Sequence, residues 1–335
     1  MPTPNLSRRL FPWLCALFST ASACSCHNFA VCEPPPAQRL SQLPARLSET
    51  GLFADVASEA LAPGVRPFRP QFELWSDGAT KRRWLALPPG GRIDTSDLDS
   101  WVFPEGTRLW KEFSRDGVRV ETRLLMKVGP GERDWADAAY LWSADQSDAV
   151  LALNGEENGL GTPHDVPNAA DCQACHGGRR SHVLGFSAIQ LAYDAEPGLL
   201  DLEGLVAEGL LTAPPRDVPR VPGDDTERAA LGYLHANCAH CHNQQRPEQQ
   251  GARCFDPENE VDFWLQVGRL DAPSDTPTYR TSFDRCVEPG DPDESRLLHL
   301  VSRREGGLWM PPLATEEVDR DGVALLRRWM EQLPE

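Results

Sequence analysis

The sequence contains one five-residue pattern, Cys-x-x-Cys-His, at two separate places. Its reactive side chains are those of Cys172, Cys175 and His176 in the first copy and of Cys238, Cys241 and His242 in the second. Two thiols at this spacing can each form a thioether with one vinyl group of a haem, and the next histidine can bind the iron. A spacing one residue longer or shorter would turn one sulfur away from its vinyl group. The repeated motif therefore predicts two covalently attached c-type haems.

Paired cysteines also occur in zinc sites and in disulfide oxidoreductases. A single four-cysteine zinc site would have to join two pairs that are separated by 62 residues, between Cys175 and Cys238. Zinc also gives no reason for a histidine after each pair. A thioredoxin-like redox pair would need a surrounding βαβ pattern, which the flanking sequence lacks. The sequence favours haem at both copies over these two alternatives.

A c-type haem usually has a second axial ligand on the other side of its iron. Met310, which lies 68 residues after His242 and precedes two prolines, is the candidate for the second haem. The alternative role for a lone methionine is core packing. For the first haem, His164 is the preferred candidate, ahead of His182 and Met126. A first haem with an open position is a further alternative.

The N-terminus has the composition of an export signal. Arg8 and Arg9 precede an apolar run over residues 10–18 that is too short to span a bilayer, and residues 21–23 are Ala-Ser-Ala. The alternative is a buried N-terminal helix. Cys24 follows directly and resembles the acylated cysteine of a bacterial lipoprotein, which competes with simple cleavage after residue 23. We therefore expect a location in the periplasm or cell envelope, with or without a lipid anchor at Cys24.

The formal net charge is −17, and loss of residues 1–23 would remove two arginines and no acidic residue, giving −19. Such an acidic chain is not expected to bind nucleic acid or an anionic membrane surface, so membrane contact would come only through the lipid anchor. The charge suits a redox partner protein with a basic docking surface. The ten cysteines suit an oxidising compartment, and Cys254 and Cys286 are candidates for a disulfide.

The residues from 72 to 153 alternate between apolar and polar side chains, as strands do. Asp116-Gly117 separates two such runs and predicts a hairpin, and residues 137–153 predict two more strands. We expect a sandwich-like antiparallel core that contains the tryptophans of this region, namely Trp75, Trp84, Trp101, Trp110, Trp135 and Trp142.

Helical patterns dominate the end of the chain. An Asp224-x-x-Glu227 cap begins a helix whose stripe continues through Cys238 and Cys241. A closing helix places one apolar face on Val323, Leu326, Met330 and Leu333. The predicted class is α+β. Its predicted segments are a signal peptide at 1–23, a flexible tether at 24–46, a β-rich domain at 47–165, a first haem-binding segment at 166–215 and a small all-α cytochrome-c-like domain at 216–335.

Three C-terminal stretches resemble a family of exported dihaem c-type cytochromes of Gram-negative bacteria that have a C-terminal cytochrome-c-like domain. They are YLHANCAHCHN, VEPGDPDESRLLHLV and MPPLATEEVDRDGVALLRRWM, and the wider similarity runs from about residue 47 to 333. The resemblance implies that Cys238 and Cys241 attach a haem, that His242 binds its iron and that Met310 lies opposite. Cys172, Cys175 and His176 would serve the other haem. The segment 254–286 departs from the family pattern.

Two functions follow from two fixed haems. The first is electron transfer, for which a six-coordinate haem between His242 and Met310 is suited, and we expect this rather than catalysis. The alternative is a dihaem enzyme of the peroxidase or oxidase type, in which one haem supplies electrons to a second, open haem. The long β-rich region favours this alternative, because simple electron transfer does not require it. Against it, no clear acid–base group surrounds the first motif apart from Asp165 beside His164.

Overall fold

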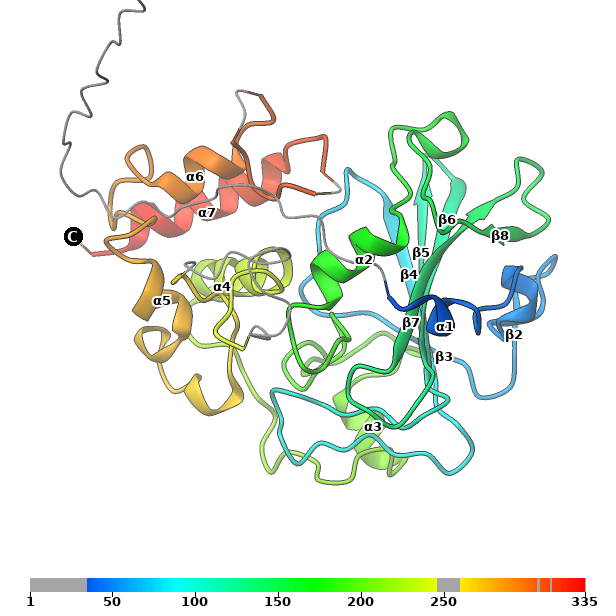
Figure 1. Cartoon of the computed structure of the whole chain (residues 1–335). Helices are drawn as coiled ribbons and strands as arrows, with labels where there is room; N and C mark the ends of the chain where they lie inside the picture. The colour runs from blue at the N-terminus through cyan, green and yellow to red at the C-terminus, as the bar shows by residue number, and fades with distance from the viewer. Residues whose placement is uncertain (1–34, 246–259, 306–307, 314, 335) are drawn as a thin grey trace, which may run out of the picture.

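The computed structural model describes residues 35–245, 260–305, 308–313 and 315–334. Its main sheet has six antiparallel strands that follow one another in chain order. Figure 1 shows this sheet beside the group of C-terminal helices. The strands are β3 (Arg66–Phe68), β4 (Thr80–Ala86), β5 (Arg108–Arg115), β6 (Val118–Lys127), β7 (Trp135–Trp142) and β8 (Ala149–Leu151). A separate two-stranded ribbon is formed by β1 (Phe53–Asp55) and β2 (Ala60–Leu61).

The predicted hairpin is confirmed as β5 and β6, which pair in antiparallel register around residues 116 and 117. Asp116 has a φ of 51° and Gly117 a φ of 83°, so both turn residues adopt the left-handed region that a tight hairpin turn requires. This explains why an Asp-Gly pair stands at the turn. The two strands predicted within 137–153 are also present, as β7 and β8.

The two faces of the sheet bury different side chains. Trp84, Trp110 and Trp142 point to one face, which residues 43–65 cover. Leu85 and Leu109 point to the other, which residues 183–211 cover. The prediction of a sandwich-like domain is therefore wrong: in the part of the chain that the structure describes, loops and short helices cover both faces instead of a second large sheet. The predicted core tryptophans are buried, except for Trp75, which is half-buried.

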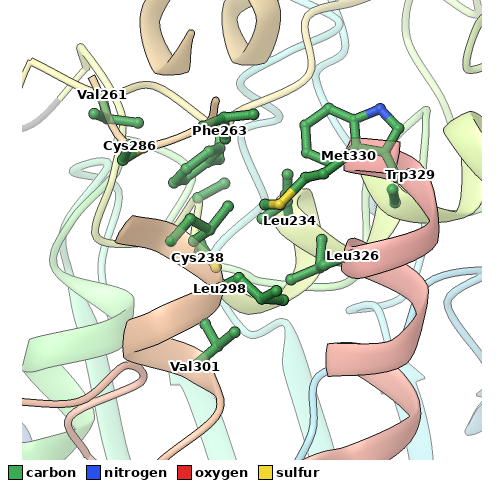
Figure 2. Close-up of a cluster of buried hydrophobic side chains, with 14 of the residues drawn as sticks. Leu234, Cys238, Val261, Phe263, Cys286, Leu298, Val301, Leu326, Trp329 and Met330 are labelled. Carbon is green, nitrogen blue, oxygen red and sulfur yellow. The ribbon is translucent and has the colours of Figure 1, made fainter. Parts of the chain in front are cut away.

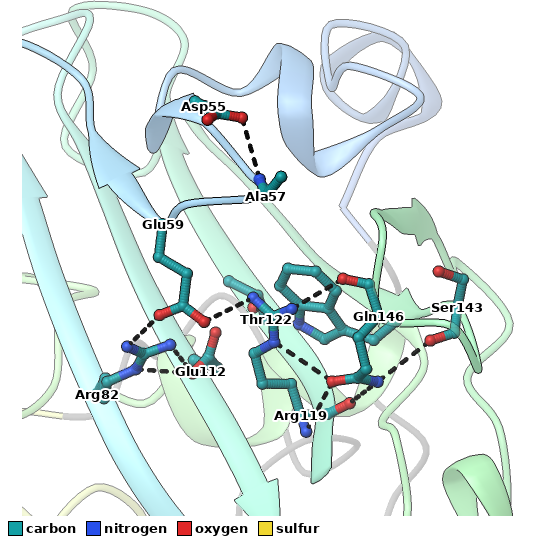
Figure 3. A network of polar contacts seen from close by, with 10 residues as sticks. Asp55, Ala57, Glu59, Arg82, Glu112, Arg119, Thr122, Ser143 and Gln146 are labelled. Carbon is teal, nitrogen blue, oxygen red and sulfur yellow. Dashed lines mark hydrogen bonds and ion pairs between the residues drawn. The ribbon is translucent and has the colours of Figure 1, made fainter.

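A polar network fixes the β1–β2 ribbon to the sheet (Figure 3). Glu59, between the two strands of the ribbon, forms ion pairs with Arg82 at 2.6 Å and with Arg119 at 3.1 Å. Arg82 also pairs with Glu112 at 2.7 Å. Burial raises the pKa of Glu112, although Arg82 acts in the opposite direction. The network thus holds the β1–β2 ribbon against the sheet. It also gives the buried Glu112 carboxylate a charged partner.

The helices are short and lie mainly at the end of the chain. They are α1 (Ala37–Leu40), α2 (Ala169–His176), α3 (Leu202–Ala207), α4 (Asp225–Asn237), α5 (Pro277–Ser282), α6 (Arg296–Val301) and α7 (Arg320–Gln332), with 3-10 turns at Leu47–Glu49, Gly159–Gly161, Val267–Arg269 and Pro273–Asp275. The predicted cap is confirmed, because Asp224 Oδ1 accepts the Glu227 N–H at 2.9 Å. The predicted closing helix is α7, and its Leu326 and Met330 are fully buried.

The prediction of a small all-α cytochrome-c-like domain at 216–335 is wrong. The fold is built on the six-stranded sheet, and the short C-terminal helices are joined to it by the loop before β4 instead of forming a cytochrome-c-like unit. Asp77 in this loop accepts the Glu316 and Glu317 N–H groups at 2.9–3.1 Å. The Trp75 N–H donates to Asn237 Oδ1 at 2.7 Å. These hydrogen bonds join the end of α4 and the segment before α7 to the β-rich part.

Close packing adds to these hydrogen bonds. The ring of Phe72, in the same loop, lies against Gly232 of α4, where an added Cβ would overlap the ring. Arg115 at the end of β5 pairs with Glu317 at 2.9 Å. Glycine at position 232 therefore allows α4 to approach the loop that leads into the sheet.

The N-terminal predictions fall mostly outside the described residues. These are the signal peptide at 1–23, Cys24 and the first part of the tether; Cys254 of the predicted disulfide is also outside. Within the rest of the tether, Ala37–Leu40 forms α1 and Leu43 is buried against the sheet. No helix in the described ranges has both the length and the apolar character that crossing a membrane requires.

Candidate functional site

The first motif lies on α2, which packs beside β7 (Figure 1). Asn168 caps this helix: its Oδ1 accepts the N–H groups of Ala170 at 2.8 Å and Asp171 at 3.0 Å. In return, the Asn168 N–H donates to Asp171 Oδ2 at 3.1 Å. This capping box starts the helix at Ala169, three residues before Cys172, so both thiols and the histidine of the motif lie on one short helix.

The ring of His176 is held in one orientation. Its Nδ1 is 2.8 Å from the carbonyl oxygen of His182, so Nδ1 must carry the hydrogen and donate it. Nε2 is then left with a free lone pair, which is the arrangement that metal-binding histidines show. Burial is the main cause that lowers the pKa of His176 to about 4, and the nearby His182 contributes in the same direction. The imidazole is therefore neutral at pH 7, as iron binding requires.

A second layer supports this arrangement, and sequence reasoning missed its central member. His182 Nε2 lies 2.8 Å from Asp137 Oδ2, and the His182 ring stacks on Trp135 at 5.5 Å. Gln173 on α2 donates to the same carboxylate oxygen at 2.8 Å. Burial acts to raise the pKa of Asp137, but His182 and Gln173 outweigh it and lower the pKa. An acidic residue in the middle of β7, where alternation predicts packing, was the available signal.

A cavity of about 590 Å³ opens beside the motif. Cys172, Cys175 and His176 all line it, and so does His240 of the second motif. Its apolar walls include Trp101, Leu109, Leu125, Phe186 and Trp264. A volume of several hundred Å³ is typical of a site for a small molecule or cofactor, and here charged side chains such as Lys111 and Asp137 line the cavity beside its apolar walls.

Burial controls the protonation of the ionisable side chains around the cavity. It raises the pKa of the Cys172 and Cys175 thiols, which are therefore uncharged at pH 7. It also lowers the pKa of Lys111 well below its usual value, and Arg83 and Arg123 lower it further. The cavity thus combines neutral thiols with a group of basic side chains on the sheet.

The second motif lies in a turn directly after α4. Cys238 is the C-cap of that helix, and the His242 N–H donates to the Cys238 carbonyl at 2.9 Å. The predicted continuation of the helix through Cys241 is therefore replaced by a turn. The two motifs touch, because Cys241 Sγ is 3.8 Å from the carbonyl oxygen of Ala174. Burial is the main cause that lowers the pKa of His240 to about 3, and the nearby His176 and His242 contribute in the same direction.

Cys238 belongs to the apolar cluster shown in Figure 2. It packs with Leu234, Phe263, Leu298 and Leu326, as well as with other members of that cluster, and it is only 9 % exposed. Burial raises the pKa of its thiol to about 12. The predicted ligand Met310 packs against the same cluster, so one apolar region contains both Cys238 and the thioether that was expected to face its haem. A porphyrin at Cys238 would have to be accommodated among these packed side chains.

The candidate distal ligands of the first haem are engaged elsewhere. His164 Nε2 lies 2.8 Å from Glu121 Oε1, and its ring packs against Phe113 at 5.2 Å. His182 is bound to Asp137, and Met126 packs against the opposite face of the sheet. Neither His164, His182 nor Met126 lines the cavity beside His176.

Among the described residues, no group of three or more His, Cys, Asp or Glu side chains is arranged to hold a metal ion by itself. The four motif cysteines are thus not gathered into one such group in the described ranges. The first motif does suit a haem: it offers two thiols and a neutral, oriented imidazole on one wall of a largely apolar cavity. At the second motif, the donor set suits a haem, with Met310 in the cluster around Cys238. Comparison of the chain with models of protein families, with curated proteins and with solved structures found no match.

Proposed function

We propose that this protein is an exported dihaem c-type cytochrome that transfers electrons through two covalently bound haems. Cys172 and Cys175 would attach one haem and His176 would bind its iron. Cys238, Cys241 and His242 would do the same for the other, with Met310 opposite. When bound, such a haem supplies reversible one-electron chemistry at its iron.

The observation that carries the proposal is the contact between the two motifs. The 3.8 Å approach of Cys241 Sγ to the Ala174 carbonyl brings the two attachment sites together. His240 of the second motif lines the same cavity as Cys175 and His176 of the first. Two centres attached to touching segments are well placed to exchange electrons, whereas two independent binding sites would have no need to adjoin.

The residues around the first motif have defined parts in this function. Asp137 orients His182, and the His182 carbonyl holds the Nδ1 hydrogen of His176, so that Nε2 is available to iron. Apolar side chains such as Trp101 and Phe186 form part of the cavity wall. Ligands that are fixed in advance limit the reorganisation that accompanies a change of iron charge, which suits electron transfer.

An acidic redox protein is best matched by a basic partner. With a net charge of −17, the chain would attract a partner protein that has a basic docking surface. The experiment is to reduce the purified protein and mix it with a small basic cytochrome in a stopped-flow instrument. We expect fast oxidation whose rate falls as salt is added, because salt screens the attraction. A reduced protein that reacts with peroxide but not with the basic acceptor would contradict the proposal.

A second candidate function is a dihaem peroxidase or oxidase. It is favoured by the engagement of His164 with Glu121 and of His182 with Asp137, because these contacts leave neither histidine on the cavity wall opposite His176. A first haem without a protein ligand on that side would be open to a small substrate. A high-spin ferric signal and ready binding of cyanide would favour this function, whereas a fully low-spin oxidised spectrum would favour electron transfer alone.

A further inference from the structure

Three cationic side chains form a row across the sheet. Arg83 on β4 lies opposite Lys111 on β5, and Lys111 lies opposite Arg123 on β6. Residues directly opposite each other on antiparallel strands point to the same face, and all three line the cavity beside the first motif. Like charges in such positions repel one another, so this cation row (Arg83, Lys111 and Arg123) is costly unless a negative group balances it.

Six acidic residues line the same cavity, Asp137 and Asp171 among them, but in the described ranges only Glu73 and Glu121 form an ion pair with a member of the row. Arg123 donates from Nη2 to Glu121 Oε1 at 2.6 Å, and Glu121 also contacts His164. Arg83 donates from Nη2 to Glu73 at 3.3 Å. Its Nη1 is buried and has no hydrogen-bond partner among the described residues, although the whole side chain is only 6 % exposed.

Lys111, at the centre of the cation row, has the least compensation. Its Nζ lies 4.7 Å from the ring centroid of Phe113, which is a contact with a neutral group. Across the described ranges, the structure gives it neither an ion pair nor a hydrogen bond. A lysine that lines a cavity between two arginines and lacks a carboxylate of its own is positioned to receive an anion from outside the chain.

The cation row is close to the parts that would hold the first haem. Asp137, which orients His182, lies opposite Leu125, two residues along β6 from Arg123. At about 3.3 Å per residue, this separation corresponds to roughly 7 Å along the sheet. The same cavity therefore presents the motif thiols, the His176 ring and the cation row.

We infer that the cation row binds a pair of carboxylates, namely the two propionates of the haem attached at Cys172 and Cys175. This inference rests on the proposed function and extends it to the residues that anchor the haem edge. A haem carries two carboxylates on one edge, and guanidinium and ammonium groups are their natural partners. The carboxylates would satisfy Lys111 and the unpaired Nη1 of Arg83, and would relieve the repulsion within the row.

The anchoring has an electrical consequence. Cations held at the propionates disfavour the additional positive charge of ferric iron, so they raise the reduction potential of the haem beside them. Removal of one cation should lower that potential. A purely structural role for the cation row would not produce a directed shift confined to one haem.

The test is a spectroelectrochemical titration of the mature dihaem protein with Lys111→Met and Arg83→Gln. Both changes remove a charge from the cavity while keeping a long side chain. We expect both variants to retain two haems. At the wild-type midpoint of one haem, we expect the ferrous-to-ferric ratio to fall about tenfold, which equals about 59 mV for one electron. Arg108→Gln, at an exposed position of the same strand β5, is the matched control and should leave both potentials unchanged.

The other possible results separate a failure of the propionate inference from a failure of the proposed function. If both variants keep two haems with unchanged potentials, the cation row does not bind propionates, and the proposed function stands. If added acetate shifts the wild-type potential and Lys111→Met abolishes that shift, the cation row binds a free anion and the propionate assignment is wrong. If the wild-type protein attaches no haem, the proposed function fails, and this inference fails with it.

Discussion

His176 shows how much of a candidate metal site is set by atoms that are not themselves ligands. The hydrogen bond from its Nδ1 to the His182 carbonyl fixes the tautomer, and Asp137 fixes His182. A ligand that is oriented in advance loses little conformational freedom when it binds a metal. Hydrogen bonding also distinguishes His176 from His164. The Nε2 atom of His164 already contacts Glu121 and is not available to a metal in this arrangement.

Met310 is the residue on which the state of the second haem depends. Met310→Leu should abolish the near-infrared or red charge-transfer band of a methionine-bound ferric haem, because leucine fills the same space without a sulfur. Met330→Leu is the matched control, since Met330 lies in the same apolar cluster and is fully buried. A band that survives in Met310→Leu and disappears in the control would show that the other methionine is the ligand.

His235 should make stability depend on pH. It accepts the Leu265 N–H at Nδ1 (3.1 Å), and burial lowers its pKa to about 3, with Arg179 and His240 acting in the same direction. Because the pKa is about 6.5 in the unfolded chain, the stabilisation is present above pH 6.5 and is lost as the pH falls toward 3.

The measurement is the free energy of unfolding at pH 7 and pH 5. Between these values, the wild type should lose roughly 2 kcal/mol more than His235→Asn, which keeps a hydrogen-bond acceptor but cannot be protonated in this range. Equal losses in the two proteins would show that His235 is not the titrating group.

At the scale of elements, α2 is held by its cap and by its contact with β7. Asn168→Ala removes the acceptor for two backbone N–H groups and should cost about 1 kcal/mol in the free energy of unfolding. Asn168→Asp keeps that acceptor and should remain close to the wild type. Urea denaturation of the three proteins makes the comparison, and an unchanged stability in Asn168→Ala would show that the cap does not contribute.

Local sequence signals predicted the elements that depend on neighbouring residues. Asp116-Gly117 specified its hairpin because few residues tolerate two left-handed positions in succession. The apolar spacing through Leu326 and Met330 specified α7, and Asp224 specified the start of α4. Such features need no knowledge of the rest of the chain.

Contacts between distant segments could not be read in the same way. The opposition of Arg83, Lys111 and Arg123 depends on the register of three strands, which a shift of one residue would destroy. The link from Asp137 to His182 spans 45 positions of the chain. The predictions of a sandwich and of a cytochrome-c-like domain were wrong for the same reason. Alternation and helical spacing indicate which side of an element is buried, but not which other segment packs against it.

At the scale of the whole molecule, the loop before β4 joins the sheet to the C-terminal segment. Asp77, which is 6 % exposed, accepts the N–H groups of Glu316 and Glu317. Asp77→Ala should cost about 2 kcal/mol, because hydrogen bonds to a buried charged group are lost. Asp77→Asn keeps one acceptor oxygen and should cost less.

Thermal unfolding followed both by circular dichroism and by tryptophan fluorescence measures this cost. We expect one cooperative transition in the wild type, because the loop before β4 is hydrogen-bonded both to α4 and to the segment before α7. Two separate transitions in the wild type would indicate that the C-terminal helices fold independently.

The most direct test of the account is the intact mass of the mature protein, purified from a bacterium that attaches haem to exported proteins. We predict a red protein whose mass exceeds that of the processed chain by two haems, and by one haem when Cys172 and Cys175 are both changed to serine. A colourless protein without added haem mass, or one that contains zinc at the thiols, would contradict the central claim.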